Sequence, residues 1–182
     1  DGRFNKVANV VGSTMHYHPH GDASIYTALV NLANCDLFIE KQGNYGNFMT
    51  GDEAAAARYI ECRLLPFAKK VLYNPEITEY IESYDGRSKE PVVFPAKIPV
   101  VLIQGTEGIA VGMSTKILPH NALEVIDAQI AALKGEEFHL YPDFPGGGIM
   151  DVSDYQDGLG KVKVRAVIEP LDKNKLVITQ LP

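Results

Sequence analysis

The chain has 182 residues, of which 46% are hydrophobic and 22% charged, and its formal net charge is −6. These proportions are typical of globular chains and argue against disorder or low complexity. No apolar run approaches the roughly 20 residues of a membrane-spanning helix, and the start shows no signal peptide pattern, so we expect a cytoplasmic protein with no membrane partner. The length allows one large domain or two small ones.

The two cysteines, Cys35 and Cys62, have no paired spacing, so neither a disulfide framework nor a cysteine zinc site is predicted. The first residue is Asp1 rather than Met, and residues 178–182 read as an interrupted strand. We therefore expect a fragment of a longer protein. The negative charge argues only mildly against nucleic-acid binding, because residues 1–20 form a small electropositive end.

The first third of the chain is expected to fold as a helix, a turn and a second helix. Apolar residues recur from Lys6 to Val11, and Gly12 breaks that pattern. Asp22 is the expected N-cap of the second helix. Its apolar residues recur at helical spacing and are Ile25, Ala28, Leu29 and Leu32. Such a pair of helices is compatible with a DNA-binding helix-turn-helix and with any helical hairpin.

Residues 41–52 are rich in turn-forming residues and are expected to form a wing-like loop. The alanine run at 54–57 is expected to begin a helix that continues to about Leu72, with an interruption near Pro66. A further helix is expected over residues 75–84. This part of the chain is therefore predicted to be mainly loop and helix.

The character of the chain changes near residue 95, where we place a soft domain boundary. The elements expected beyond it are short strands with glycine turns at 100–112, a helix at 122–133, and strands at 161–168 and 175–181. Lys161, Lys163 and Arg165 share one strand face, which fits a solvated surface better than a nucleic-acid track. The glycines at 146–148 are expected to form a turn, because no phosphate-binding motif follows them.

Arg58 and Tyr59 form the residue pair with the clearest chemical potential. A phenol has a pKa near 10, so it needs a base or a positive field before it can attack a phosphodiester. Arg58 supplies that field and stabilises charge on the nonbridging oxygens, where His20 is a candidate second donor. Taken alone, however, a tyrosine beside an arginine is more often a packing residue.

Three alternating histidines precede the second helix. His16, His18 and His20 would share one side of an extended segment and could bind a metal together with Asp22. The proline and glycine among them bend the segment, so a histidine that donates to a phosphate is at least as natural. No Asp-x-Asp motif occurs in the chain, and a catalytic Mg²⁺ would have to come from a partner protein.

Short motifs occur in a specific order along residues 6–150. They are Lys6-Val7-Ala8, Tyr17-His18-Pro19-His20-Gly21-Asp22, Gln42-Gly43-Asn44, residues 54–61, residues 108–113 and Pro119-His120-Asn121. This series resembles the A subunit of bacterial type IIA topoisomerases. The general run of residues is more similar to the A subunit of topoisomerase IV than to that of gyrase.

The resemblance implies an α+β fold, with a winged-helix domain at 1–95 and the start of an α/β tower domain at 96–182. It implies the DNA-cleaving and rejoining subunit of an ATP-dependent type II topoisomerase. Tyr59 matches the nucleophile that becomes joined to a DNA 5′ end, Arg58 matches its neighbouring catalytic arginine, and His20 matches the histidine near the scissile phosphate.

Further positions match the family's DNA and drug contacts. Lys6 and His18 match DNA-binding positions, and Ile117 matches an isoleucine that wedges between base steps. Ala23 and Thr27 stand where the family usually offers a serine and an acid to fluoroquinolones. Because Ala23 has no hydroxyl, weak fluoroquinolone action is expected.

The resemblance also implies partners and cofactors. Double-stranded DNA is the expected substrate. The expected assembly is an A2B2 heterotetramer, in which the A subunits form a homodimer through the DNA gate and each binds a topoisomerase B subunit. Mg²⁺ and ATP would be bound by the partner B subunit, whereas this chain would bind neither and hold no metal. The expected location is the bacterial cytoplasm, in association with the nucleoid.

Two alternatives remain open at the level of sequence. One is a noncatalytic winged-helix DNA-binding scaffold, which would bind duplex in a salt-dependent way without a covalent product. The other is a metal-dependent hydrolase that uses the histidines and Asp22.

Overall fold

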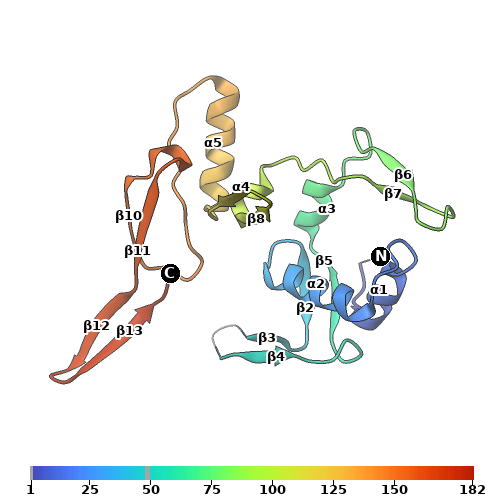
Figure 1. Ribbon diagram of the computed structural model, residues 1–182, viewed down its shortest axis with the longest axis horizontal. Coiled ribbons are helices and arrows are strands. Elements are labelled where there is room, and N and C mark those ends of the chain that lie inside the picture. Colours follow the sequence, from blue (N-terminus) through green and yellow to red (C-terminus); the bar gives the residue numbers. More distant parts are fainter. Residues whose placement is uncertain (1, 48–49) are drawn as a thin grey trace. The chain divides into compact units, whose positions relative to one another are not determined.

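The computed structural model describes residues 2–47 and 50–182 (Figure 1). The chain divides into two compact units, Asp1–Lys97 and Ile98–Pro182. Both combine helices with small antiparallel sheets, and the described residues contain five α-helices. None of these described helices is long and apolar enough to cross a membrane. The predicted mixed helix and sheet composition is therefore confirmed at this coarse level.

Two helices lead the first unit, as predicted. They are α1 (Val7–Thr14) and α2 (Asp22–Asn34), which pack against each other. Gly12 lies inside α1, so the expected break there is wrong. The N-cap of α2 is Gly21 and Asp22 is its first helical residue, where its carboxylate accepts a 2.9 Å hydrogen bond from the Ala23 N–H. A negative charge in this first turn also interacts favourably with the helix dipole.

A three-stranded antiparallel sheet lies beside these helices, with strand order β1-β5-β2. Its strands are β1 (Asn5–Lys6), β5 (Glu61–Leu64) and β2 (Ile39–Gln42). Two hairpins accompany it, β3 (Tyr45–Asn47) with β4 (Asp52–Ala54), and β6 (Tyr80–Glu82) with β7 (Lys89–Pro91). The expected loop at 41–52 is thus partly strand, although residues 48–49 lie outside the described residues.

The helix predicted to run from the alanines to Leu72 is wrong over its first half. Ala54 pairs with Tyr45 in the β3–β4 hairpin, and the following residues turn into β5. Only α3 (Pro66–Leu72) is helical, with Pro66 in the first turn where its missing N–H is harmless. Tertiary hydrogen bonding overrides alanine's helix propensity here. The helix expected at 75–84 is also wrong, because its end forms β6.

The core of the first unit lies between α1, α2, α3 and the central sheet. Each helix contributes two buried residues to it. The buried apolar residues are Val7, Val11, Val30, Ala33, Phe38, Ile39, Tyr45, Ile60, Cys62, Ala68 and Val71. Since Ile60 is among them, the residues next to Tyr59 are fixed in the core while Tyr59 itself faces outward.

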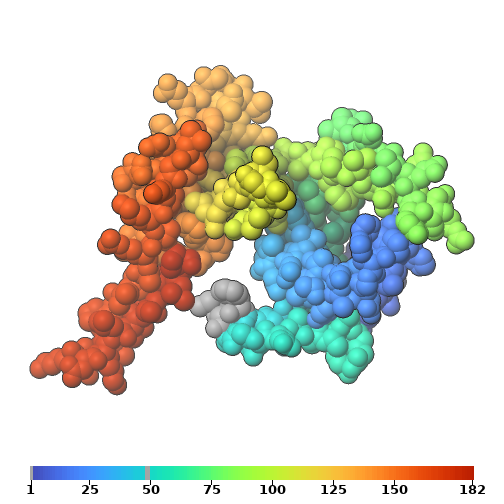
Figure 2. Space-filling view, in the orientation of Figure 1, coloured from blue at the N-terminus to red at the C-terminus, as the bar shows by residue number. Residues whose placement is uncertain are grey.

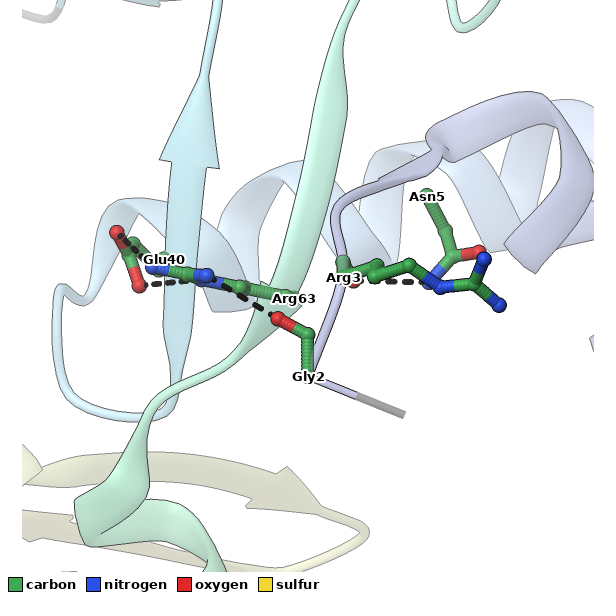
Figure 3. A network of polar contacts seen from close by, with 5 residues as sticks. All are labelled: Gly2, Arg3, Asn5, Glu40 and Arg63. Atoms are coloured by element: carbon green, nitrogen blue, oxygen red, sulfur yellow. Dashed lines mark hydrogen bonds and ion pairs between the residues drawn. The ribbon is translucent and has the colours of Figure 1, made fainter.

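Arg63 on β5 ties the beginning of the chain to the central sheet (Figure 3). Its guanidinium donates to both carboxylate oxygens of Glu40 on β2, at 2.7 and 2.9 Å, and to the carbonyl oxygen of Gly2 at 3.1 Å. The Phe4 ring lies 4.4 Å from its Cζ. The bidentate geometry fixes the orientation of both charged groups. Arg63 therefore links β2, on one side of β5, to the start of the chain on the other side.

We expect this ion pair to make stability depend on acidic pH. The hydrogen bonds from Arg63 lower the pKa of Glu40, so its contribution is complete above the unfolded value of about 4.3 and is lost as pH falls through the folded pKa. Arg63→Met should flatten this part of the dependence, while Lys69→Met on an exposed helix face should not. Thermal unfolding midpoints from pH 7 to pH 3 measure the effect, and parallel curves for wild type and Arg63→Met would contradict it.

The second unit begins with a short helix and a hairpin. The apolar residues at 100–103, expected to be a strand, form α4 (Val100–Gln104). The hairpin pairs β8 (Thr106–Ala110) with β9 (Met113–Ile117), as the glycine spacing predicts. Gly112 has φ of +77° in its turn, and a Cβ on Gly105 would lie 2.7 Å from the carbonyl oxygen of Ile117. A side chain is therefore excluded at Gly105.

The predicted helix at 122–133 is confirmed as α5 (Ala122–Lys134). The Asn121 side chain accepts from the N–H groups of Leu123 and Glu124, and Gly135 ends the helix in the left-handed conformation. These are the expected start and stop signals of a helix. His120, just before the cap, is buried with Nδ1 3.0 Å from the carbonyl oxygen of Leu102.

Two further hairpins complete the second unit. They are β10 (Ile149–Asp154) with β11 (Lys161–Arg165), joined through a short 3-10 turn, and β12 (Val167–Asp172) with β13 (Lys175–Gln180). On β11 the basic residues are exposed and the valines half-buried, as predicted. The β12–β13 hairpin stands out from its unit as a narrow arm in the space-filling view (Figure 2). The glycines at 146–148 allow the backbone near Leu181 to come close to their own backbone. This close approach accounts for the glycines, so a bound phosphate is not needed to explain them.

Candidate active site

Tyr59 lies in a tight turn between β4 and β5. Its N–H donates to the carbonyl oxygen of Ala56 at 2.8 Å, which closes the turn. The side chain is 64% exposed, whereas the next residue, Ile60, is 1% exposed. Within the described residues the Tyr59 hydroxyl has no hydrogen-bond partner. The phenol is thus exposed to solvent while the neighbouring Ile60 is fixed in the core. A nucleophile that reacts with a large substrate needs such exposure.

The first turn of α1 holds the residues on both sides of Arg58 and Tyr59. The Val7 N–H donates to the carbonyl oxygen of Ile60, and the Ala8 N–H donates to that of Ala57, both at 3.0 Å. N–H groups in the first turn of a helix have no partner within the helix. Here they are satisfied by the tyrosine loop, so the loop conformation depends on α1.

Arg58 lies against the phenol ring itself. Its Cζ is 4.6 Å from the ring centroid of Tyr59, within the range of a cation–π contact. Both side chains are exposed, and no carboxylate in the described part of the chain forms an ion pair with Arg58. The guanidinium donors therefore remain available to an anionic ligand beside the phenol.

Lys6 is engaged by a carboxylate close to the tyrosine. Its Nζ lies 2.8 Å from Oε1 of Glu61, directly across the β1–β5 pairing. Such an exposed pair contributes little to stability, so a phosphate could replace the carboxylate at modest cost. The ion pair of Lys6 with Glu61 was not predicted from the sequence, because no local pattern indicates a cross-strand partner so far away in the chain.

The histidines lie in the exposed connection between α1 and α2. The rings of His18 and His20 meet edge to face with centroids 4.3 Å apart, and the His20 N–H donates to the carbonyl oxygen of His18 at 2.8 Å. This compact turn differs from the extended segment considered for metal binding. The predicted role of His20 beside Tyr59 stays a prediction.

A cleft of about 450 Å³ lies between the two leading helices and the tyrosine loop. The lining residues come from α1 and the position just after it, from the first half of α2, and from the alanines before Arg58. They include Ala8, Met15, Ala23, Tyr26 and Ala57. The small side chains among them leave this space open beside the loop that contains Arg58 and Tyr59.

Ala23 and Thr27 lie one turn apart on an exposed face of α2. The Thr27 hydroxyl donates to the carbonyl oxygen of Ala23 at 2.9 Å. That hydroxyl is therefore directed back to its own helix. Neither position presents an acid or a free hydroxyl group.

Ile117 belongs to the second unit. It ends β9 opposite Thr106, is half-buried, and is followed by Leu118 and Pro119. Its predicted role as a wedge between base steps stays a prediction.

Comparison with known proteins identifies the family. A family profile for the A subunit of DNA gyrase/topoisomerase IV matches residues 1–182. The chain belongs to this family. It is 66% identical over 182 residues to the A subunit of DNA topoisomerase 4 from Borreliella burgdorferi, and 42% identical over 197 aligned residues to the A subunit of DNA gyrase from Haloquadratum walsbyi. The family resemblance of the ordered motifs is thereby confirmed.

These gyrase and topoisomerase IV relatives are much longer than this chain. The match covers all of the chain but 29% of the Borreliella protein, and 97% of the chain but 23% of the Haloquadratum protein. The A subunit of DNA topoisomerase 4 from Caulobacter vibrioides is 41% identical over all of the chain and 27% of its own length. The chain thus corresponds to under a third of each of these relatives.

This member of the gyrase and topoisomerase IV family offers no group of metal ligands in its described part. Among residues 2–47 and 50–182, no three His, Cys, Asp or Glu side chains are grouped so that they could hold a metal ion. The alternative of a histidine-based metal hydrolase therefore lacks its ligand set there.

Proposed function

We propose that this chain is the DNA-cleaving and rejoining part of an ATP-dependent type II DNA topoisomerase. The observation that carries the proposal is the exposed Tyr59 phenol, in contact with Arg58 on a loop fixed by α1. Membership of the family of gyrase and topoisomerase IV A subunits supports the same activity.

The proposed reaction is a reversible exchange of phosphodiester bonds. The Tyr59 Oη attacks a backbone phosphorus, a tyrosyl O–P bond forms, and the bond from phosphorus to the 3′ oxygen breaks. The phenol proton is lost, and the 3′ oxygen leaves as a hydroxyl after taking up a proton. Attack by that hydroxyl reverses the step, restores the phenol and rejoins the strand, so no bond energy is spent.

Arg58 and His20 would stabilise the phosphate during this exchange. A guanidinium presents a rigid fork of donors to nonbridging oxygens and keeps its charge at any working pH. Lys6 and His18 would bind the DNA backbone, and Ile117 would wedge between base steps and bend the duplex. Lys6 forms an ion pair with Glu61. On DNA binding, Lys6 would leave this carboxylate and pair with a DNA phosphate instead.

The family relationship also supports a proposal for the wider assembly. Residues 1–95 would form a winged-helix domain and residues 96–182 the start of a tower domain. Two A subunits would meet at the DNA gate and bind two B subunits, which would hold Mg²⁺ and ATP. The enzyme would act in the cytoplasm, on nucleoid DNA.

Covalent trapping tests the proposal. The full-length protein, combined with its B partner, Mg²⁺ and supercoiled DNA, should give a protein–DNA adduct that survives denaturant. A noncatalytic scaffold would instead show salt-dependent duplex binding without any adduct. Repeated failure to trap an adduct under conditions of tight DNA binding would therefore favour the scaffold.

We expect Ala23→Ser to increase fluoroquinolone-stabilised cleavage by the complete enzyme. The position is exposed in the first turn of α2, and a hydroxyl there adds one hydrogen bond to the drug's hydrated metal, which corresponds to about a tenfold lower drug concentration for half-maximal cleavage. Ser24→Ala, one position along the same turn, serves as the control. Drug titration of linearised DNA measures the change, and strong drug action on the wild type would contradict the expectation.

A further inference from the structure

Two tyrosine hydroxyls outside the Arg58 and Tyr59 pair hold the ends of the catalytic loop. The Tyr26 hydroxyl, on α2, donates to the carbonyl oxygen of Ala55 at 2.7 Å. The Tyr45 hydroxyl, on β3, donates to the carbonyl oxygen of Glu61, also at 2.7 Å. One bond lies before the Arg58 and Tyr59 pair in the chain and the other after it.

These bonds complete a frame around residues 55–61. The Ala55 N–H donates to the carbonyl oxygen of Asn44 at 3.0 Å, and α1 contributes the two bonds already described. Each side-chain bond spans a large sequence separation and connects the loop to a different element. The turn that carries Tyr59 is thus attached to α1, α2 and the β2–β3 connection at once.

The Tyr45 phenol is suited to act as a permanent donor. Tyr45 is 4% exposed, and its burial is the main cause that raises its pKa, so it stays protonated throughout the physiological range. Tyr26 is half-buried beside the cleft between α1 and α2. Phenylalanine would fill either space equally well, so packing alone does not require the two hydroxyls.

We propose that Tyr26 and Tyr45 are positioning residues for the cleavage reaction, which fix the loop so that the Tyr59 oxygen meets the phosphorus in line. This inference rests on the proposed function. A nucleophile held in a near-attack geometry removes a large part of the barrier, and misplacement by about 1 Å costs about a hundredfold in rate. Because both hydroxyls donate to backbone carbonyl oxygens of the loop, they would act through the backbone.

The test uses the complete A2B2 enzyme with Tyr26→Phe, Tyr45→Phe, the double variant and Tyr84→Phe. Tyr84 is 79% exposed and its hydroxyl has no hydrogen bond among the described residues, so it is the matched control. We expect each single variant to slow single-turnover cleavage and rejoining by about tenfold, and the double variant by about a hundredfold. Because the barrier rises equally from both sides, the fraction of DNA cleaved at equilibrium stays unchanged.

Three measurements separate positioning from simple stability. Amide hydrogen exchange of residues 54–61 should accelerate in the variants while the unfolding midpoint and the Kd for DNA stay near wild type. Wild-type rates in the double variant, or a loss confined to DNA affinity or to global stability, would overturn the inference. Failure of the wild-type enzyme to form the adduct, or an adduct that persists in Tyr59→Phe, would instead overturn the proposed function.

Discussion

Tyr59→Phe is expected to abolish the covalent DNA adduct of the complete enzyme, with a loss of cleavage on the order of 10⁴-fold or more. In the proposed reaction, the substitution removes the atom that forms the bond to phosphorus. It leaves the ring that lies against Arg58, and the lost hydroxyl has no hydrogen-bond partner among the described residues. The loop, the fold and the DNA affinity should therefore remain close to wild type.

The decisive measurement is denaturant-resistant DNA on a gel, together with the Kd of the same preparation for uncleaved duplex. Tyr84→Phe, another exposed tyrosine of the first unit, should cleave normally. If Tyr59→Phe kept the wild-type amount of adduct, another residue would be the nucleophile. If it lost DNA binding as well, the exposed phenol would be a binding contact instead.

Local signals in the sequence predicted the elements whose stabilising contacts are also local. The helices α2 and α5 have apolar residues at helical spacing, and α5 has both an Asn121 cap and a Gly135 stop. The alanine run misled because the hydrogen bonds of its backbone go to distant residues, Ala8 and Asn44. A short apolar run such as 100–103 fits a strand or a helix equally, and it forms α4.

The candidate site shows the same division between residue identity and geometry. The ordered motifs singled out Arg58 and Tyr59, and the structure presents both at the surface in mutual contact. The carboxylate of Glu61 beside Lys6 and the hydroxyls of Tyr26 and Tyr45 could not be predicted, because strand register and helix packing create those contacts. The roles of His20, His18 and Ile117 stay predictions.

Arg58→Ala is expected to lower single-turnover cleavage by about 10²- to 10³-fold at saturating DNA, the usual effect of losing one preorganised donor to developing negative charge. Arg58→Lys should fall between wild type and Arg58→Ala, because an ammonium keeps the charge but cannot present the guanidinium's planar fork of donors. The exposed cation–π contact is worth about 0.5–1 kcal/mol, so both variants should unfold near the wild-type temperature.

A catalytic role of the Arg58 charge can be distinguished from general attraction of a cation to DNA, because the catalytic role depends on where the charge lies. Arg87, an exposed arginine in the β6–β7 turn that lies 3.8 Å from Asp85, is the matched control, and Arg87→Ala should leave the cleavage rate at saturation unchanged. A cation that only attracts the phosphate backbone would change the Kd and its salt dependence but not that rate. If Arg58→Ala behaved in this way, its contact with Tyr59 would be structural. A loss confined to the rate places the guanidinium at the phosphate under attack.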